Sequence, residues 1–312
     1  MDSTELPFGI VTLLHVSIGV SVNVFLLLFY ARLVSTSRRT SSSELILTQL
    51  ALANTIILLT SGIAETLSAW GLRNFLGDVG CKILSYLYRV ARGLAICTTC
   101  LLSVFQAVTV SPGTSRWAGV KAKLHRCIVP FCLLSWVLNM LVECSVAIQM
   151  TGPQNRSHSQ NVMDHKYCSH VFGSPETTWA LTVLVSLRDV SFVGLMSLAS
   201  GYMVFVLHRH HRQVRHLHGP GRSPRVMPEV RAAKRVIALV TLYVLLYGRQ
   251  TITLSILLNL KDKSPLLVKS HMVLSFTFSA VSPFLVIHRD QRIRMFRQRE
   301  SADSHLDLPA PS

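Results

Sequence analysis

The chain has 312 residues, of which 50% are hydrophobic and only 15% are charged, and its mean hydropathy is +0.42. Soluble globular chains carry about a quarter of their residues charged, so this composition argues against an ordinary soluble domain and indicates a protein of the lipid bilayer. Lys and Arg outnumber Asp and Glu by 31 to 15. Such an excess of positive charge suits nucleic acid, an anionic membrane surface, or the cytoplasmic loops of a membrane protein.

Seven segments are long and apolar enough to be membrane-spanning helices, each of which needs about 20 mostly apolar residues. Only the first two contain a long run free of charge, and the last is short and contains His271. No basic segment precedes the first span, so we expect no cleaved signal peptide. In chain order the spans are Phe8–Tyr30, Leu45–Leu67, Ile83–Val110, Ile128–Met150, Thr178–Leu207, Val236–Leu260 and Ser270–Ile287.

The basic residues between these spans predict the orientation in the membrane. With the N-terminus outside, 20 Lys and Arg lie on the cytoplasmic side, seven lie outside and four lie within spans. The positive-inside bias predicts this asymmetry for seven spans. Without any one of the spans, the later loops would change sides and the asymmetry would be lost. Because the charges are spread over separate loops without a binding motif, the pattern argues against nucleic acid. It favours contact with anionic lipid and with a cytosolic partner.

These observations predict an all-α integral membrane protein, a seven-helix bundle with a cytoplasmic C-terminus. Residues 1–7 are then a short extracellular N-terminus and residues 8–287 the membrane domain. Residues 288–312 are a cytoplasmic tail. Its first part, HRDQRIRMFRQRE, is predicted to form a short helix on the inner membrane surface.

Two features of the outer loops agree with this topology. The sequence Asn155-Arg156-Ser157 is the single Asn-x-Ser/Thr sequon of the chain, and it falls in the second outer loop, where Asn155 can be glycosylated. Five of the seven cysteines lie in or beside spans and are expected to be buried thiols. The other two, Cys81 and Cys168, lie on the oxidising side. We expect a disulfide between them, the alternative being two unpaired outer thiols.

The third span ends in Phe105-Gln106-Ala107, where rhodopsin-type G-protein-coupled receptors carry Asp-Arg-Tyr. Long strings nevertheless match one receptor family in order, from about the first span to just past the seventh. They are LTQLALANTIILL from Leu47, GCKILSYLYRVARGLAICTTCLLSVFQAVTVSP from Gly80, SRW from Ser115, RDVSFVGLMSLASGYMVFVLHRHHRQVRHLH from Arg188 and SPFLVIHRD from Ser282. The chain closely resembles the vomeronasal type 1 receptors.

This resemblance implies a chemosensory G-protein-coupled receptor in the plasma membrane of sensory neurons. Such a receptor detects pheromone-like small molecules and signals to a heterotrimeric G protein, of the Gi type. The alternative is a multi-pass small-molecule transporter, which would usually show an internal repeat or two matching broken spans. Neither occurs here, and no motif of a membrane enzyme is present. We therefore expect no catalytic residue, no cofactor and no bound metal.

Charged residues inside spans are costly and tend to mark functional paths. Here they are Glu65, Arg89, Arg92, Glu143, Arg188, Asp189 and Arg249, and all lie in the outer halves of their spans. This placement predicts a ligand cavity open to the outside, with Tyr88, Arg89, Arg92, Asp189 and Arg249 among its walls. The alternative is that these charges pair across helices and hold the bundle together. Asp189 in particular should meet a basic residue of another helix, since adjacent Arg188 points about 100° away from it.

Other polar residues have simpler roles. Asn23 and Asn54 are predicted to hydrogen-bond across the first, second and seventh spans. Five histidines between His208 and His218 lack the spacing of a zinc site, so we expect a solvated basic loop there.

Overall fold

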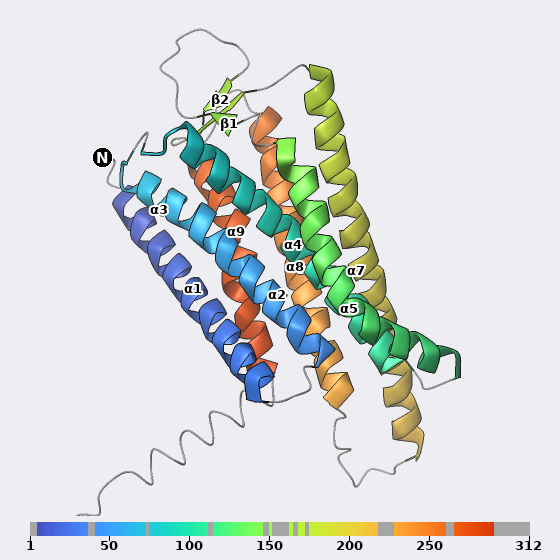
Figure 1. The fold of residues 1–312 in the computed structure, drawn as a ribbon. Helices are drawn as coiled ribbons and strands as arrows, with labels where there is room; N and C mark the ends of the chain where they lie inside the picture. The colour runs from blue at the N-terminus through green and yellow to red at the C-terminus, as the bar shows by residue number, and fades with distance from the viewer. Residues whose placement is uncertain are drawn as a thin grey trace, which may run out of the picture.

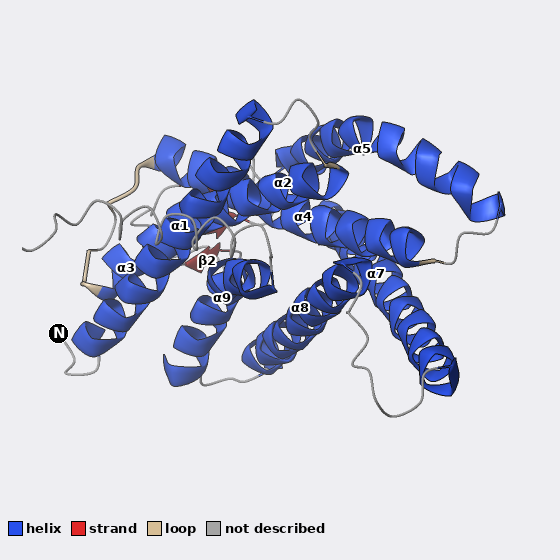
Figure 2. Cartoon of the chain, turned by 90° about the horizontal axis from the view of Figure 1, so that it is seen from below, coloured by secondary structure: helices blue, strands red, loops and turns tan. Residues whose placement is uncertain are grey.

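The computed structural model describes residues 5–36, 41–72, 75–111, 115–145, 150–151, 162–164, 168–171, 175–217, 228–259 and 265–289. These residues form seven long helices that run side by side, with a small sheet at one end (Figure 1). Seen along the bundle, α4 lies in the middle and contacts α2, α5, α7 and α8 (Figure 2). The long helices are α1 (Glu5–Thr36), α2 (Ser42–Ile57) continued through η1 (Leu58–Gly62) into α3 (Ile63–Ala69), α4 (Asp78–Val110), α5 (Ser115–Val142) continued by η2 (Glu143–Ser145), α7 (Pro175–Leu217), α8 (Pro228–Asn259) and α9 (Pro265–Arg289).

The seven-helix bundle predicted from the sequence is confirmed. Six of its helices are long and apolar enough to cross a membrane. The seventh, α8, has an apolar run from Val236 that is interrupted by Arg249 and Gln250. Helices satisfy every backbone hydrogen bond within the segment, which is why a chain of this composition adopts them in lipid.

Several helix ends differ from the predicted spans. The fourth span was predicted to reach Met150, but the helix ends near Ser145 and Met150 belongs to a strand. At its other end α7 continues to Leu217, so His208, His210, His211 and His216 lie in a helix and the predicted loop is wrong there. Arginine and glutamine, which stand among these histidines, have good helix propensity and favour a helix that continues beyond its apolar segment.

Local sequence explains how several helices begin. Three of them start on a proline, Pro175, Pro228 and Pro265, a residue suited to the first helical position because its missing N–H would have no partner there. At the start of α2, the Ser41 amide donates to the Glu44 carboxylate at 3.2 Å, which satisfies one of the free donors at the helix end.

Polar side chains link the helices where the bundle is buried. Asn23 of α1 donates to the Ser279 carbonyl of α9 at 2.9 Å, and Asn54 of α2 donates to Ser282 Oγ of α9 at 3.0 Å. The sequence predicted that these two asparagines bond across the first, second and seventh spans, and the structure supplies the partners. Gly19 lets α1 and α9 approach closely, because a Cβ at Gly19 would lie 3.1 Å from Ala280 Cα.

A three-stranded antiparallel sheet covers one end of the bundle. Its strands are β1 (Met150–Thr151), β2 (Val162–Asp164) and β3 (Ser169–Val171), with β3 in the middle. Cys168, directly before β3, is bonded to Cys81 in the first turn of α4, and their Cα atoms lie 5.7 Å apart. The predicted disulfide is confirmed, and it ties the loop over the bundle. We call this the disulfide end.

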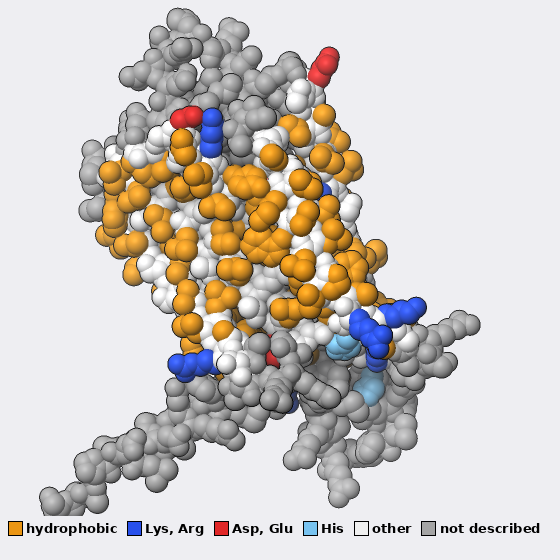
Figure 3. Space-filling view, in the orientation of Figure 1, with side chains coloured by type: hydrophobic (Ala, Val, Ile, Leu, Met, Phe, Trp, Pro, Cys, Tyr) orange, Lys and Arg blue, Asp and Glu red, His pale blue; other side chains and the backbone are white. Residues whose placement is uncertain are grey.

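The surface of the bundle divides into bands. On the face shown in Figure 3, hydrophobic side chains cover the middle of the bundle, while Lys and Arg gather at the rim opposite the disulfide end, with His beside them. The exposed apolar residues include Phe131 and Leu133 of α5, Leu198 and Phe205 of α7, and Leu28 of α1. Exposed apolar side chains spread over several long helices mark the lipid-facing surface of a membrane protein.

Candidate functional site

The centre of the candidate site is an ion pair between α4 and α7. Arg92 Nη2 lies 2.6 Å from Asp189 Oδ2. The Asp189 side chain is only 2% exposed, while that of Arg92 remains 33% exposed. The predicted partner of Asp189 on another helix is therefore Arg92, and the arginine still has an accessible side after the pair has formed.

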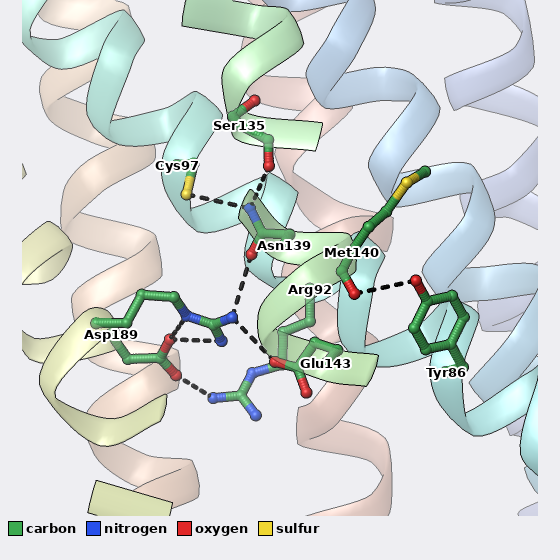
Figure 4. Close-up of polar contacts among 9 residues, drawn as sticks. Tyr86, Arg92, Cys97, Ser135, Asn139, Met140, Glu143 and Asp189 are labelled. Atoms are coloured by element: carbon green, nitrogen blue, oxygen red, sulfur yellow. Dashed lines mark hydrogen bonds and ion pairs between the residues drawn. The ribbon is translucent and has the colours of Figure 1, made fainter. Parts of the chain in front are cut away.

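Arg188 joins this pair to the end of α5. Its guanidinium lies 3.0 Å from Asp189 Oδ1 and 2.9 Å from Glu143 Oε1 (Figure 4). Glu143 is buried and lies in the short turn that ends the fourth span. Two arginines and two carboxylates from three helices thus form one buried cluster whose formal charges cancel. We call Arg92, Glu143, Arg188 and Asp189 the charge cluster.

A chain of hydrogen bonds continues from the charge cluster into the bundle. Arg188 donates to Asn139 Oδ1 at 3.2 Å, and Asn139 donates to the Ser135 carbonyl at 2.7 Å (Figure 4). Ser135 Oγ in turn accepts from Gln49 of α2 at 2.9 Å. Polar groups of four helices are therefore bonded in one series, and such networks fix a single arrangement of the helices that carry them.

Gly93 makes room for this chain on α4. A Cβ at this position would overlap the Asn139 amide oxygen and lie 3.2 Å from Arg188 Nη1. Glycine is therefore required for close approach here, and any side chain would displace Asn139 or Arg188.

Arg89 lies one turn from Arg92 towards the disulfide end. It is close enough to interact electrostatically with Glu143, Tyr88 and the neighbouring arginines. Among the described residues it has neither a hydrogen bond nor an ion pair within bonding distance. The four formal charges of the charge cluster cancel, so among the described residues Arg89 adds a positive charge beside a neutral group.

Aromatic side chains lie near Arg92. Tyr88 of α4 and both Tyr243 and Tyr247 of α8 lie within electrostatic reach of its guanidinium. The rings of Tyr243 and Tyr247 stack with their centroids 5.9 Å apart. Faces of tyrosine rings are suited to a flat apolar body or a cation.

Four of the five residues predicted to line a ligand site thus come together: Tyr88, Arg89, Arg92 and Asp189. Arg249 does not join them. It is exposed and shares a helical stripe of α8 with Leu245 and Ile252, which are also exposed. That stripe belongs to the lipid-facing surface of the bundle.

The sequence reasoning did not select Asn139, Tyr243 or Tyr247. Signals for them exist: Asn139 lies four residues before Glu143, and Tyr247 lies four residues after Tyr243. Residues at this spacing share a helix face. Asn139 lies on the same helix face as the intramembrane carboxylate of Glu143. It could therefore have been predicted as a site residue, as the charged residues were.

The geometry defines a class of protein, a seven-helix membrane bundle closed by a disulfide-tied loop and carrying a buried charge cluster near that loop. A family model described as the vomeronasal organ pheromone receptor family matches residues 7–299. Vomeronasal type-1 receptor 3 of Homo sapiens is 39% identical over 295 residues, which cover 94% of each chain.

More distant relatives match over similar lengths. Olfactory receptor class A-like protein 1 of Danio rerio is 35% identical over 296 residues, covering 94% of this chain and 92% of its own. Vomeronasal type-1 receptor 1 of Homo sapiens is 34% identical over 301 residues, covering 95% of this chain and 85% of its own. The chain belongs to the vomeronasal type 1 receptor family and is a multi-pass membrane protein of a receptor class.

Proposed function

We propose that this protein is a G-protein-coupled receptor for pheromone-like small molecules in the plasma membrane of sensory neurons. The observation that carries the proposal is the charge cluster of three helices near the disulfide end, in a chain of this family. A transporter or an enzyme has no comparable support. We propose that signalling passes to a heterotrimeric G protein of the Gi type, without a cofactor, metal or catalytic residue.

The proposed orientation places the disulfide end outside the cell. An oxidising compartment favours the Cys81–Cys168 bond. The opposite rim carries the gathered Lys and Arg (Figure 3), which suits the cytoplasmic side. In this orientation residues 1–7 are extracellular, 8–287 form the receptor domain and 288–312 are a cytoplasmic tail. Of the tail, residues from 290 onward, where the short surface helix was predicted, lie outside the described part of the chain.

We propose that the ligand binds beside the charge cluster on the accessible side of Arg92. Tyr88 and the Tyr243–Tyr247 stack then contact its apolar body, and Arg89 faces an anionic or acceptor group. Asp189 acts by holding Arg92 in place. Arg249 is left out of this site because its stripe on α8 faces lipid, where an arginine is tolerated only by reaching towards the interface.

Replacing Asn155 with Gln is expected to abolish N-glycosylation of the receptor. The reason is that Asn155 begins the single sequon of the chain and lies outside in the proposed orientation. The measurement is the glycosidase-sensitive shift in gel mobility of the expressed protein. Wild-type receptor without a shift would argue against the orientation, and a shift that survives in the variant would show glycosylation elsewhere.

The function as a whole is tested by ligand-stimulated nucleotide exchange on a Gi heterotrimer. The receptor reconstituted with the heterotrimer should accelerate exchange when a ligand from a panel of small volatile and anionic molecules is added.

A further inference from the structure

Arg89 differs from the other charged residues within the spans, because no described residue supplies it with a bonded countercharge. Four of those residues form the charge cluster. Glu65 has interactions of its own, and Arg249 lies on the exposed stripe of α8. Arg89 is half-buried and makes neither a hydrogen bond nor an ion pair with the described part of the chain.

A charge in this position is costly without a counterion. Arginine keeps its proton in proteins, so Arg89 cannot become neutral by losing it. Buried charges are normally paired, because a countercharge offsets the free energy of removing them from water. The cost is greater still for a charge within a membrane span. A negative ion beside Arg89 would therefore stabilise the folded receptor.

The carboxylates of the charge cluster do not serve as this counterion. Glu143 acts on Arg89 electrostatically, but its carboxylate is bonded to Arg188 at 2.9 Å. Asp189 is bonded to both Arg92 and Arg188. These two arginines also lie within electrostatic reach of Arg89. Three arginines and two carboxylates thus leave one positive charge in excess, and an anion beside Arg89 is attracted by its guanidinium and by the arginines next to it.

We propose that Arg89 binds a chloride ion in the ligand-free receptor. Chloride is an abundant small anion outside the cell, and one chloride cancels the single excess charge. Arg89 lies one turn nearer the disulfide end than Arg92, and in the proposed orientation this end faces outward. The displacement of chloride by the anionic group of the ligand rests on the proposed function, whereas the binding of chloride does not depend on signalling.

The test measures the thermal unfolding temperature of purified full-length receptor in phosphatidylcholine nanodiscs, without ligand or G protein. Sodium gluconate is replaced by sodium chloride at constant total salt, so that screening stays the same. The wild type should gain about 2–4 °C, because an ion that binds only to the folded receptor stabilises it by mass action.

Arg89→Gln should lose this dependence on chloride. Because the variant lacks a charge that has no bonded partner, it should unfold at or above the wild-type temperature in gluconate, and below it in chloride. Arg249→Gln removes the same charge from the exposed stripe of α8 and should respond to chloride as the wild type does. Arg89→Lys keeps the charge with fewer donors and should need several-fold more chloride for the same shift, which provides a second test if Arg89→Gln does not fold.

Three results would overturn the proposal. The first is a wild-type unfolding temperature that is the same in chloride and in gluconate. The second is an equal shift in wild type and in Arg89→Gln or Arg89→Lys, which would assign the effect of chloride to another part of the receptor. The third is loss of the shift in Arg249→Gln, since that residue lies outside the proposed site. Because neither ligand binding nor nucleotide exchange is measured, failure here leaves the proposed receptor function standing.

Discussion

Replacing Asp189 with Asn is expected to remove most of the folded receptor from the cell surface. Asp189 is the buried carboxylate shared by Arg92 and Arg188, at 2.6 and 3.0 Å. Removing its charge leaves two arginines facing each other in the bundle with Glu143 as the remaining counter-charge of the cluster. Breaking a buried ion pair in this way costs about 3–5 kcal/mol, comparable with the total stability of many domains. Surface immunolabelling and the thermal unfolding temperature measure the loss.

A matched control uses an exposed ion pair. Asp78 and Lys82 are four residues apart at the start of α4, 3.0 Å from each other, and their side chains are 53% and 35% exposed. Asp78→Asn should change stability by less than about 1 kcal/mol. If Arg92→Gln is added to Asp189→Asn, surface expression should partly recover, because the uncompensated arginine is gone. Equal surface levels of Asp189→Asn and wild type would contradict a structural charge cluster.

Arg89→Gln is expected to weaken responses to anionic ligands by about tenfold or more, with normal surface expression. Arg89 has no bonded carboxylate in the described chain and faces the proposed ligand, whereas Arg92 is already neutralised by Asp189. A charge-assisted hydrogen bond to a ligand is worth about 1.5–3 kcal/mol. The measurement compares half-maximal concentrations for anionic and neutral ligands in cells that express equal amounts of receptor.

Arg249→Gln is the matched control for this change. It removes the same charge at a similar depth, but from the exposed stripe of α8. It should leave the ratio of anionic to neutral responses unchanged. A loss in Arg249→Gln equal to that in Arg89→Gln would refute the assignment of the anion contact to Arg89. An equal loss for both ligand classes in Arg89→Gln would keep the site but remove its preference for anions.

The sequence was sufficient to predict the helices and the depth of the charged residues in the bundle, because both follow from local patterns. Apolar runs of span length, and the asymmetry of loop charges, specify a bundle without knowledge of any contact. The same holds for the disulfide, since Cys81 and Cys168 were the two cysteines left outside the spans. The partner of Asp189 was predicted as a basic residue of another helix, and the structure identifies it as Arg92.

The bonding of Arg188 could not be predicted. From the helical rotation, Arg188 and Asp189 were expected to face different neighbours, and Arg188 does reach α5. Its side chain is long enough, however, to contact Asp189 as well, so both arginines share one carboxylate. The helical rotation gives the direction of the Cα–Cβ bond only. The end of a long, flexible side chain such as that of Arg188 can lie in another direction. The short sheet was missed for a related reason, because its strands are stabilised by partners distant in sequence.

The most direct test of the receptor function is nucleotide exchange measured on purified components. Wild-type receptor, reconstituted with a Gi heterotrimer, should accelerate exchange of the bound nucleotide when an active ligand is added. Arg89→Gln should require a higher concentration of an anionic ligand for the same rate, while Arg249→Gln should not. Ligand binding without any acceleration of exchange, or ligand transport across vesicles that hold the receptor alone, would contradict the account.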